Sequence, residues 1–154
     1  MRYNESMLLL KNKRATHDYS IEKNYMAGIV LSGPEVKSLR NKSGSFKGSY
    51  VKVISEEVFL INAQITPYAF ANNEKYDPKR TRKLLLKKKE IINLAEELDK
   101  KNRTLVPLSF NAIGRNIKVK IGVGIGLKLH DKRAKMKKRT VDREVAKELK
   151  SIGR

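Results

Sequence analysis

Cysteine is absent from this chain of 154 residues, and acidic side chains are few. Without cysteine the protein has no disulfide bond, no catalytic thiolate and no zinc site built on cysteine ligands. The 16 Asp and Glu residues stand against 35 Lys and Arg residues, which gives a formal net charge of +19. Because self-repulsion on this scale is tolerated when a polyanion neutralises it, we expect nucleic acid as the partner, well ahead of an anionic membrane.

Long apolar runs are missing too. No segment approaches the roughly 18 to 20 apolar residues that span a bilayer. The apolar stretch at residues 7–10 is too short for the core of a secretory signal. We therefore expect a soluble, cytoplasmic protein with no membrane partner. At this length we expect one domain with an appendage, because single domains cluster at roughly 100 to 150 residues.

The expected organisation has three parts. Residues 1–11 carry a small apolar patch and are expected to fray. Residues 12–125 carry alternating patterns, and we expect them to form the folded domain that would bind RNA. Residues 126–154 contain eleven Lys and Arg residues, four Asp and Glu residues and no aromatic side chain. A segment of this composition cannot bury enough apolar surface to order itself, so we expect a tail that is disordered in the free protein.

The tail nevertheless carries a helical pattern. Val141, Val145, Leu149 and Ile152 recur at spacings of four, four and three residues. This spacing places them on one side of a helix, which favours folding when a partner offers a surface. A passive basic tail is the alternative.

Residues 25–40 mark a change from strand to helix periodicity. Residues 25–31 are apolar on both faces, which is typical of a buried strand. Ser32 and Glu35 then have the spacing of a capping box, with a proline in the first turn. In the short helix that follows, Lys37 and Arg40 lie three residues apart and form a basic side that can face phosphates.

Alternating patterns elsewhere predict a mainly β protein. Strands are expected near residues 17–31, 50–54, 58–66, 105–112 and 117–125. A helix with one apolar stripe is expected at residues 91–98. We therefore expect an antiparallel sheet of five or six strands with two or three short helices. Closing the sheet into a small barrel would remove its edges, and the oligonucleotide-binding type of barrel is the natural candidate.

Two basic segments are candidates for contact with a polyanion. Residues 79–89 contain seven cations and no acid. Leu85 falls off the helical stripe, so we expect either a flank contact or an exposed apolar residue inside a basic loop. Lys13 and Arg14 precede Tyr19 in a segment that, taken alone, reads as a solvated lead-in to a strand.

Patterns that would indicate catalysis are weak. The glycine-rich run at residues 122–126 looks like part of a dinucleotide-binding loop, but such a loop must open onto a helix inside a βαβ unit. The flanking strands read as antiparallel, so we reject that interpretation. His17 and His130 lie too far apart in the sequence to indicate a set of converging metal ligands. We expect no metal, no cofactor and no catalytic residue.

Four motifs, in order, resemble those of one bacterial family. They are NKRATHDYSI at residues 12–21, AGIVL and EVKSLR at residues 27–40, DPKRTRKLLL at residues 77–86, and KVKIGV with HDKR at residues 118–133. Together they are similar to the SsrA-binding proteins, also called small protein B. The resemblance spans most of the chain, from about residue 12 to residue 133.

This resemblance implies a barrel related to the oligonucleotide-binding fold. It implies binding to the tRNA-like part of transfer-messenger RNA, or SsrA RNA, and passage with that RNA into stalled ribosomes during trans-translation. It also implies ribosomal contacts at the small-subunit decoding centre and in the empty mRNA channel, where the tail becomes helical. Elongation factor Tu would be a partner through the shared RNA.

By position, the resemblance assigns Asn12 and Leu85 to contacts with transfer-messenger RNA and His130 to the decoding centre. The family usually has glutamate where Met26 stands and lysine where Leu127 stands. The candidate RNA-binding residues are Asn12, Lys13, Arg14, Tyr19, Met26, Lys37, Arg40, Arg80, Arg82, Lys83, Leu85, Lys118 and Lys120. The candidate ribosome-contacting residues of the tail are Lys128, His130, Asp131, Lys132, Arg133, Lys137, Lys138, Arg139 and Leu149.

Three other functions fit parts of the sequence. A general RNA-binding protein would share the basic composition without specificity for one RNA, and a ribosomal protein would share it as a permanent ribosome component. A nuclease would need clustered carboxylates, whereas those of this chain are scattered.

Overall fold

The computed structural model describes the backbone of residues 6–127 and 129–152, and their side chains except at 129–132, 135 and 148–152. The strands are β1 Ser6–Lys11, β2 Tyr19–Ile29, β3 Gly44–Ser45, β4 Tyr50–Ile54, β5 Glu57–Ile61, β6 Gln64–Ile65, β7 Arg82–Leu85, β8 Arg103–Ile113 and β9 Asn116–Gly126. The helices are α1 Lys13–Asp18, α2 Gly33–Arg40, α3 Lys88–Asp99 and α4 Leu129–Ile152.

Seven strands form one antiparallel sheet in the order β1-β8-β9-β2-β7-β5-β4, and β3 pairs with β6 apart from it. The prediction of a strand-rich antiparallel fold is confirmed. The closed barrel is not found among the described residues, because β1 and β4 are the two ends of the hydrogen-bonded order. β4 lies near β8, so the sheet curls, but no ladder joins these two strands. Alternation in the sequence shows which face of a strand is buried, not which strands are neighbours.

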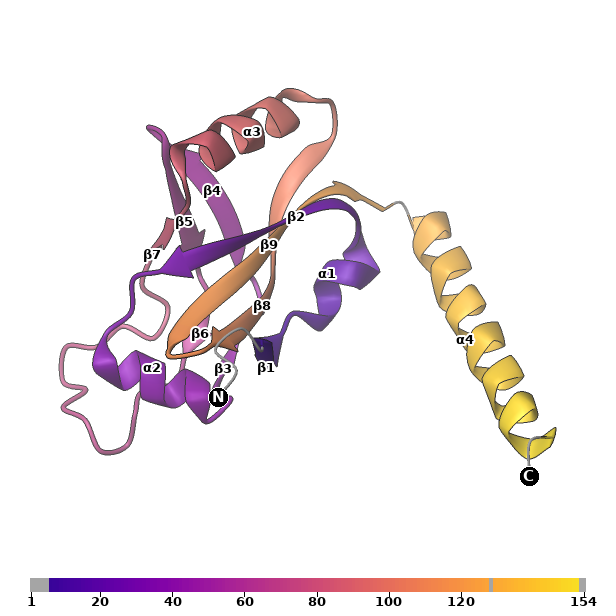
Figure 1. Ribbon diagram of the computed structural model, residues 1–154, viewed down its shortest axis with the longest axis horizontal. Helices are drawn as coiled ribbons and strands as arrows, with labels where there is room; N and C mark the ends of the chain where they lie inside the picture. The colour runs from indigo at the N-terminus through magenta and orange to yellow at the C-terminus, as the bar shows by residue number, and fades with distance from the viewer. Residues whose placement is uncertain (1–5, 128, 153–154) are drawn as a thin grey trace.

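The core lies on the inner face of this curled sheet. Ala27, Leu60, Phe110 and Val119 come from four different strands and are fully buried. The ring of Phe46 stacks on Phe110 with 4.6 Å between ring centroids. α3 covers one end of the sheet and α2 lies near the other (Figure 1). Both helices contribute a fully buried leucine to the core cluster.

The capping box at the start of α2 is confirmed. The Ser32 hydroxyl accepts a hydrogen bond from the Glu35 amide, and a Glu35 carboxylate oxygen accepts one from the Ser32 amide at 2.9 Å. Both bonds satisfy backbone donors that a helix start leaves without partners. The β2 strand therefore passes into α2 at a fixed position.

The glycine run in β9 provides space on the sheet surface. A Cβ atom at Gly122 would lie 2.9 Å from the Ile21 side chain and 3.0 Å from the Leu108 side chain. Glycine at this position therefore lets both apolar side chains lie across β9. The run lies within an antiparallel strand and not at the start of a helix, which confirms that it is not a dinucleotide-binding loop.

The N-terminal region differs from the expectation in two ways. Residues Ser6–Lys11 form β1, which pairs with β8 along most of its length, so this part of the segment expected to fray is a strand. The strand expected from residue 17 begins at Tyr19, because Lys13–Asp18 form α1. His17 lies in that helix, with Nδ1 2.9 Å from an Asp18 carboxylate oxygen.

α4 projects away from the sheet (Figure 1). The Leu127 amide donates a hydrogen bond to the Asp18 carbonyl at 2.9 Å, which ties the end of β9 to α1 just before this helix. The described side chains of α4 are all exposed. Disorder of this segment in the free protein stays a prediction. Within the described residues, no helix combines the length and apolar character needed to cross a bilayer.

Candidate nucleic-acid interface

The outer face of the central strands carries a row of lysines. Met26 pairs with Lys120, and Gly28 pairs with both Lys118 on β9 and Leu85 on β7. Paired residues in a sheet point to the same face, and their sequence neighbours point to the other. The neighbours Ala27, Val119 and Leu84 are buried. Residues 26, 85, 118 and 120 therefore point outward together.

Lys83 extends this row because it lies two residues before Leu85 on β7 and is exposed. Its ammonium group lies 3.1 Å from a Glu57 carboxylate oxygen, and both side chains are about half exposed. We call Met26, Lys83, Leu85, Lys118 and Lys120 the lysine face. It presents three cations and two apolar side chains from three adjacent strands.

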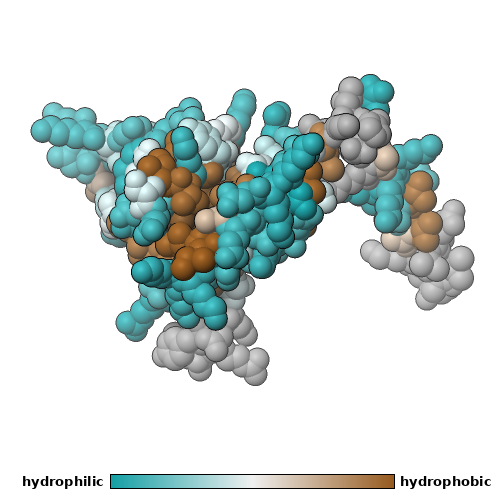
Figure 2. All heavy atoms as spheres, turned by 90° about the horizontal axis from the view of Figure 1, so that it is seen from above, coloured by the Kyte–Doolittle hydropathy of each residue, from teal (hydrophilic) through white to brown (hydrophobic). Residues whose placement is uncertain are grey.

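Leu85 is an exposed apolar residue on a strand. A Cβ atom at Gly28 would lie 3.2 Å from the Leu85 Cβ atom, so the absence of a side chain there leaves room for the leucine. Leu85 is 51% exposed, and it shares a hollow of about 290 Å³ with Lys118. Leu85 also lines an apolar hollow against α3. Figure 2, which views the molecule from above, shows a hydrophobic area on that face. Leu85 is therefore exposed, as one of the two alternatives expects, but it lies on strand β7 and not in a loop.

Asn12 lies at the other end of the lysine face. Its side-chain amide donates a hydrogen bond to the Pro107 carbonyl, and its backbone amide donates to the Leu108 carbonyl, both at 2.8 Å. The side chain therefore ties the start of α1 to β8 instead of capping the helix. Asn12 and Lys120 line the same hollow of about 350 Å³. The structure thus brings together two candidate residues that are 108 positions apart in the sequence.

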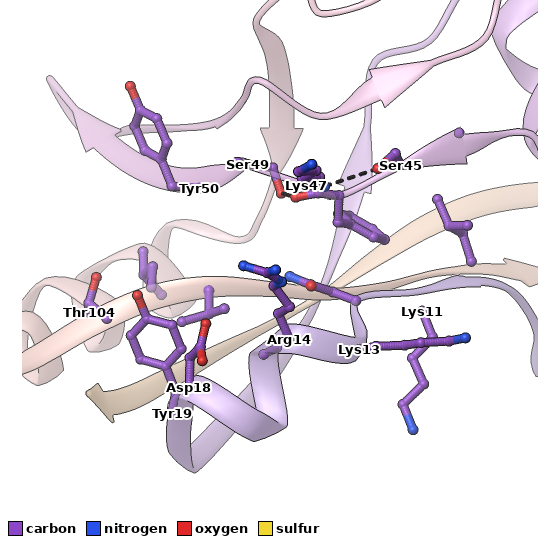
Figure 3. Close-up of a pocket in the computed structure, with 18 residues that line it drawn as sticks. Lys11, Lys13, Arg14, Asp18, Tyr19, Ser45, Lys47, Ser49, Tyr50 and Thr104 are labelled. Atoms are coloured by element: carbon purple, nitrogen blue, oxygen red, sulfur yellow. Dashed lines mark hydrogen bonds between the residues drawn. The ribbon is translucent and has the colours of Figure 1, made fainter. Parts of the chain in front are cut away.

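Lys13, Arg14 and Tyr19 line a separate, more polar hollow of about 510 Å³ (Figure 3). In Figure 3, Arg14 points from α1 towards the segment that carries Lys47, and Tyr19 lies at the same end of the hollow as Tyr50. Asn12 lines this hollow as well as the one it shares with Lys120. The cations of α1 therefore adjoin the lysine face through Asn12.

Arg82 is not on this surface. Its side chain is fully buried, and it donates hydrogen bonds to a Glu35 carboxylate oxygen at 2.7 Å, to the Ala63 carbonyl at 2.7 Å and to the Pro78 carbonyl at 3.0 Å. Arg82 alternates with the outward Lys83 and points inward like Leu84. It is therefore unavailable to a phosphate, and its assignment as an RNA contact is wrong.

Arg80 shares the same carboxylate. It bonds to both oxygens of Glu35 and to the Val30 carbonyl at 3.1 Å, and one third of its side chain remains exposed. Burial alone would raise the pKa of Glu35, but bonds from Arg80, the Ser32 amide and Arg82 lower it to about 2. The pKa of the neighbouring Tyr76 is raised by burial and by the negative charge of Glu35. The cluster joins α2, β7 and the loop that precedes β7.

The two cations of α2 are exposed at the opposite end from α3. Arg40 donates a hydrogen bond to the Arg115 carbonyl at 3.0 Å. The Lys37 ammonium lies 5.4 Å from the centre of the Tyr68 ring. Both side chains keep exposed surface, and Arg40 reaches Arg115, which lines the hollow with Leu85 and Lys118.

The model of one protein family, described as SmpB protein, matches residues 9–151.

The chain belongs to the SmpB family.

Relatives agree over nearly the whole length. The SsrA-binding protein of Alkaliphilus oremlandii is 46% identical over 142 residues, which cover 92% of each chain. That of Geotalea uraniireducens is 46% identical over 147 residues, which cover 96% of this chain and 97% of the relative. A solved structure described as "tmRNA-SmpB: a journey to the center of the bacterial ribosome" is similar with a TM-score of 0.68 and 41% identity. That match covers 82% of this chain and 93% of the solved one.

The structure describes fewer side chains in the tail than in the folded domain. Lys128 lies outside the described residues, and so do the side chains of residues 130–132 and 149, whose backbone is helical. Arg133, Lys137, Lys138 and Arg139 are exposed on α4.

Three polar residues beside the candidate site were missed. Lys11 and Asn24 line the hollow shared by Asn12 and Lys120, and Lys47 faces Arg14. Asn24 could have been found, because it alternates with the buried Tyr25 and Ala27 along β2. Lys47 precedes Gly48, whose positive φ of 75° marks a turn, but nothing local connects that turn with α1.

Proposed function

We propose that this protein binds the tRNA-like domain of transfer-messenger RNA and delivers it to stalled ribosomes for trans-translation. Membership of the SmpB family carries this proposal, and the continuous surface from Asn12 across the lysine face supports it. In this role the protein binds RNA and is not an enzyme. It acts in the cytoplasm and meets elongation factor Tu through the shared RNA.

The lysine face suits a folded RNA that is recognised by shape. Lys83, Lys118 and Lys120 contact phosphates, which position the RNA without reading its sequence. Leu85 and Met26 pack on sugars or unstacked bases between those phosphates. Met26 replaces the usual acid with an apolar contact, and Asn12, held by two backbone carbonyls, supplies a fixed polar group at the edge.

The tail acts separately from this surface. Its exposed cations on α4 suit the small-subunit decoding centre and the vacant mRNA channel, which are lined by ribosomal RNA. His130 and the residues that follow it would lie at the decoding centre, and the helix would become ordered in the channel. The curled sheet is consistent with a relative of the oligonucleotide-binding barrel that is open between β1 and β4.

A competition gel shift tests the RNA specificity. Labelled transfer-messenger RNA is bound by the full chain and challenged with excess ordinary tRNA or unstructured RNA. We expect the complex to survive both competitors, and its affinity to fall with salt at a log-log slope of about −0.7 to −0.9 per neutralised phosphate. Displacement at equal concentration by unstructured RNA would favour a general RNA binder, which the net charge of +19 also allows.

A further inference from the structure

Phe70 is the most exposed large hydrophobic side chain that the structure describes, at 89% of its surface. It lies in the loop at residues 66–81 between β6 and β7, outside the strands that carry the lysine face. Single exposed apolar residues are common on proteins. This one differs because its loop is held in place and because a second aromatic ring and a lysine lie beside it.

Hydrogen bonds around Phe70 and at Tyr76 hold the loop in place. The Tyr68 carbonyl accepts bonds from the Ala71 amide at 3.1 Å and from the Asn73 side-chain amide at 2.8 Å, which closes a tight turn around Phe70. Further along, the Tyr76 hydroxyl donates to the Ile65 carbonyl at 2.9 Å and accepts from Arg82. The buried Glu35 cluster therefore anchors the loop that presents Phe70 to solvent.

Phe70, Tyr68 and Lys37 form an aromatic–lysine cluster. The rings of Tyr68 and Phe70 meet edge to face, with 5.5 Å between centroids and 66° between planes. The Lys37 ammonium lies 5.4 Å from the Tyr68 ring centre. Tyr68 is half-buried between its two neighbours, whereas Phe70 and Lys37 are exposed. The cluster thus places an uncovered ring and a cation within reach of one nucleotide.

We propose that this cluster binds an unpaired nucleobase of RNA, with the base stacked on Phe70 and its phosphate facing Lys37. Single-stranded nucleic acid is commonly held by this combination of an aromatic platform and a cation, because every base has a π-face. A pre-positioned aromatic side chain loses little conformational freedom when the base arrives. The base belongs to transfer-messenger RNA or to ribosomal RNA, and the inference rests on the proposed function of RNA binding.

Because the chain has no tryptophan, Phe70→Trp introduces a single fluorescent reporter. Full-length Phe70→Trp protein is titrated with transfer-messenger RNA and, separately, with protein-free small-subunit ribosomal RNA. We expect at least one of the two RNAs to quench the tryptophan fluorescence and to protect the tryptophan from quenching by acrylamide. The RNA that produces this response is the source of the base. The control is Lys101→Trp, an exposed position after α3 and outside the lysine face, which we expect to respond to neither RNA.

Affinity variants separate stacking from mere apolar contact. Phe70→Ala and Phe70→Leu should both weaken binding to the responding RNA by roughly fivefold or more. Fivefold corresponds to the lower end of the loss that is typical when one stacked base is removed. Phe70→Tyr should bind like the unchanged protein. All three changes lie on an exposed loop position and leave the buried anchor intact.

If neither RNA protects the tryptophan of Phe70→Trp from acrylamide, the inference is overturned. This holds even if the variants impair ribosome function, because a ribosomal protein would then be the contact. Leucine restoring full affinity overturns it as well. If the unchanged protein fails to bind transfer-messenger RNA in the gel shift, the proposed function itself fails. If it binds and the reporter stays unprotected, only this inference fails.

Discussion

The sheet and the tail helix both carry clusters of cations, but the two regions hold them differently. On β9, Lys118 and Lys120 alternate with the buried Val119 and Ile121, so the strand pairing fixes the position of each ammonium group. On α4, the described side chains are exposed on every side, and a hydrogen bond from Leu127 to Asp18 ties the chain to the body just before the helix begins. The first arrangement suits an RNA of fixed shape, and the second suits a surface that orders the helix on contact.

Removing the tail should produce the largest and most selective loss. Deleting residues 134–154 should abolish tagging of stalled translation products while leaving binding to transfer-messenger RNA nearly intact, because Asn12 and the lysine face remain. Gel shifts and a tagging assay on the same preparation measure the two activities. Equal loss of both would contradict the separation of RNA binding from ribosomal action.

Breaking the buried ion cluster should destabilise the body strongly. Glu35→Gln leaves the fully buried Arg82 without its charged partner, and removing one member of a buried pair typically costs about 3–5 kcal/mol. Denaturant unfolding measures this loss. The matched control is Glu57→Gln, whose pair with Lys83 is half exposed and should change stability by less than about 0.5 kcal/mol. Deleting the tail should also leave the free energy of unfolding nearly unchanged, because the described side chains of α4 are exposed.

The same carboxylate gives the body a pH dependence in acid. The pKa of Glu35 is lowered from 4.5 to about 2 in the folded protein, so its stabilising effect is present above pH 4.5 and is lost as the pH falls through 2. Unfolding curves between these pH values should therefore show stability falling in the unchanged protein. The fall should be much smaller in Glu35→Gln. Parallel curves for the two proteins would place the acid-sensitive group elsewhere.

Neutralising the lysine face should have a moderate effect on RNA binding. Lys118→Ala with Lys120→Ala should weaken binding to transfer-messenger RNA and reduce the salt slope by about 2, because each lysine neutralises one phosphate. Salt-dependent gel shifts measure the slope. Lys101→Ala, an exposed cation after α3, should leave it unchanged. An unchanged slope in the double variant would move the interface off these strands.

Local features of the fold could be predicted from the sequence. The capping box of Ser32 and Glu35 lies within four residues, and the outward position of Lys118 and Lys120 follows from simple alternation. Both depend only on neighbours along the chain. The assignment of Leu85 to an RNA contact comes from the family resemblance and stays a prediction, whereas its pairing with Gly28 accounts for its position on the sheet.

Features that depend on distant segments could not be predicted. The contact region between Asn12 and Lys120 requires β1, β8 and β9 to be neighbours, and β1 itself is stable only because β8 supplies its partner. The sequence places Arg82 in one basic run, because its pattern predicts no strand at residues 82–85, whereas in β7 Arg82 alternates with the outward Lys83 and points inward. What could not be seen was Glu35, 47 residues earlier, which makes a buried arginine tolerable.

The smallest expected effect concerns the helicity of the free tail. Helices in water depend mainly on packing of an apolar face, and the described side chains of α4 have no such packing. Circular dichroism of the full chain minus that of the chain lacking residues 134–154 should therefore show little helix. Adding the small ribosomal subunit should order the segment, observed as slower proteolysis of the tail. If the difference spectrum of the free protein instead shows the helix content of a complete α4, the tail is folded before it binds, like the lysine face.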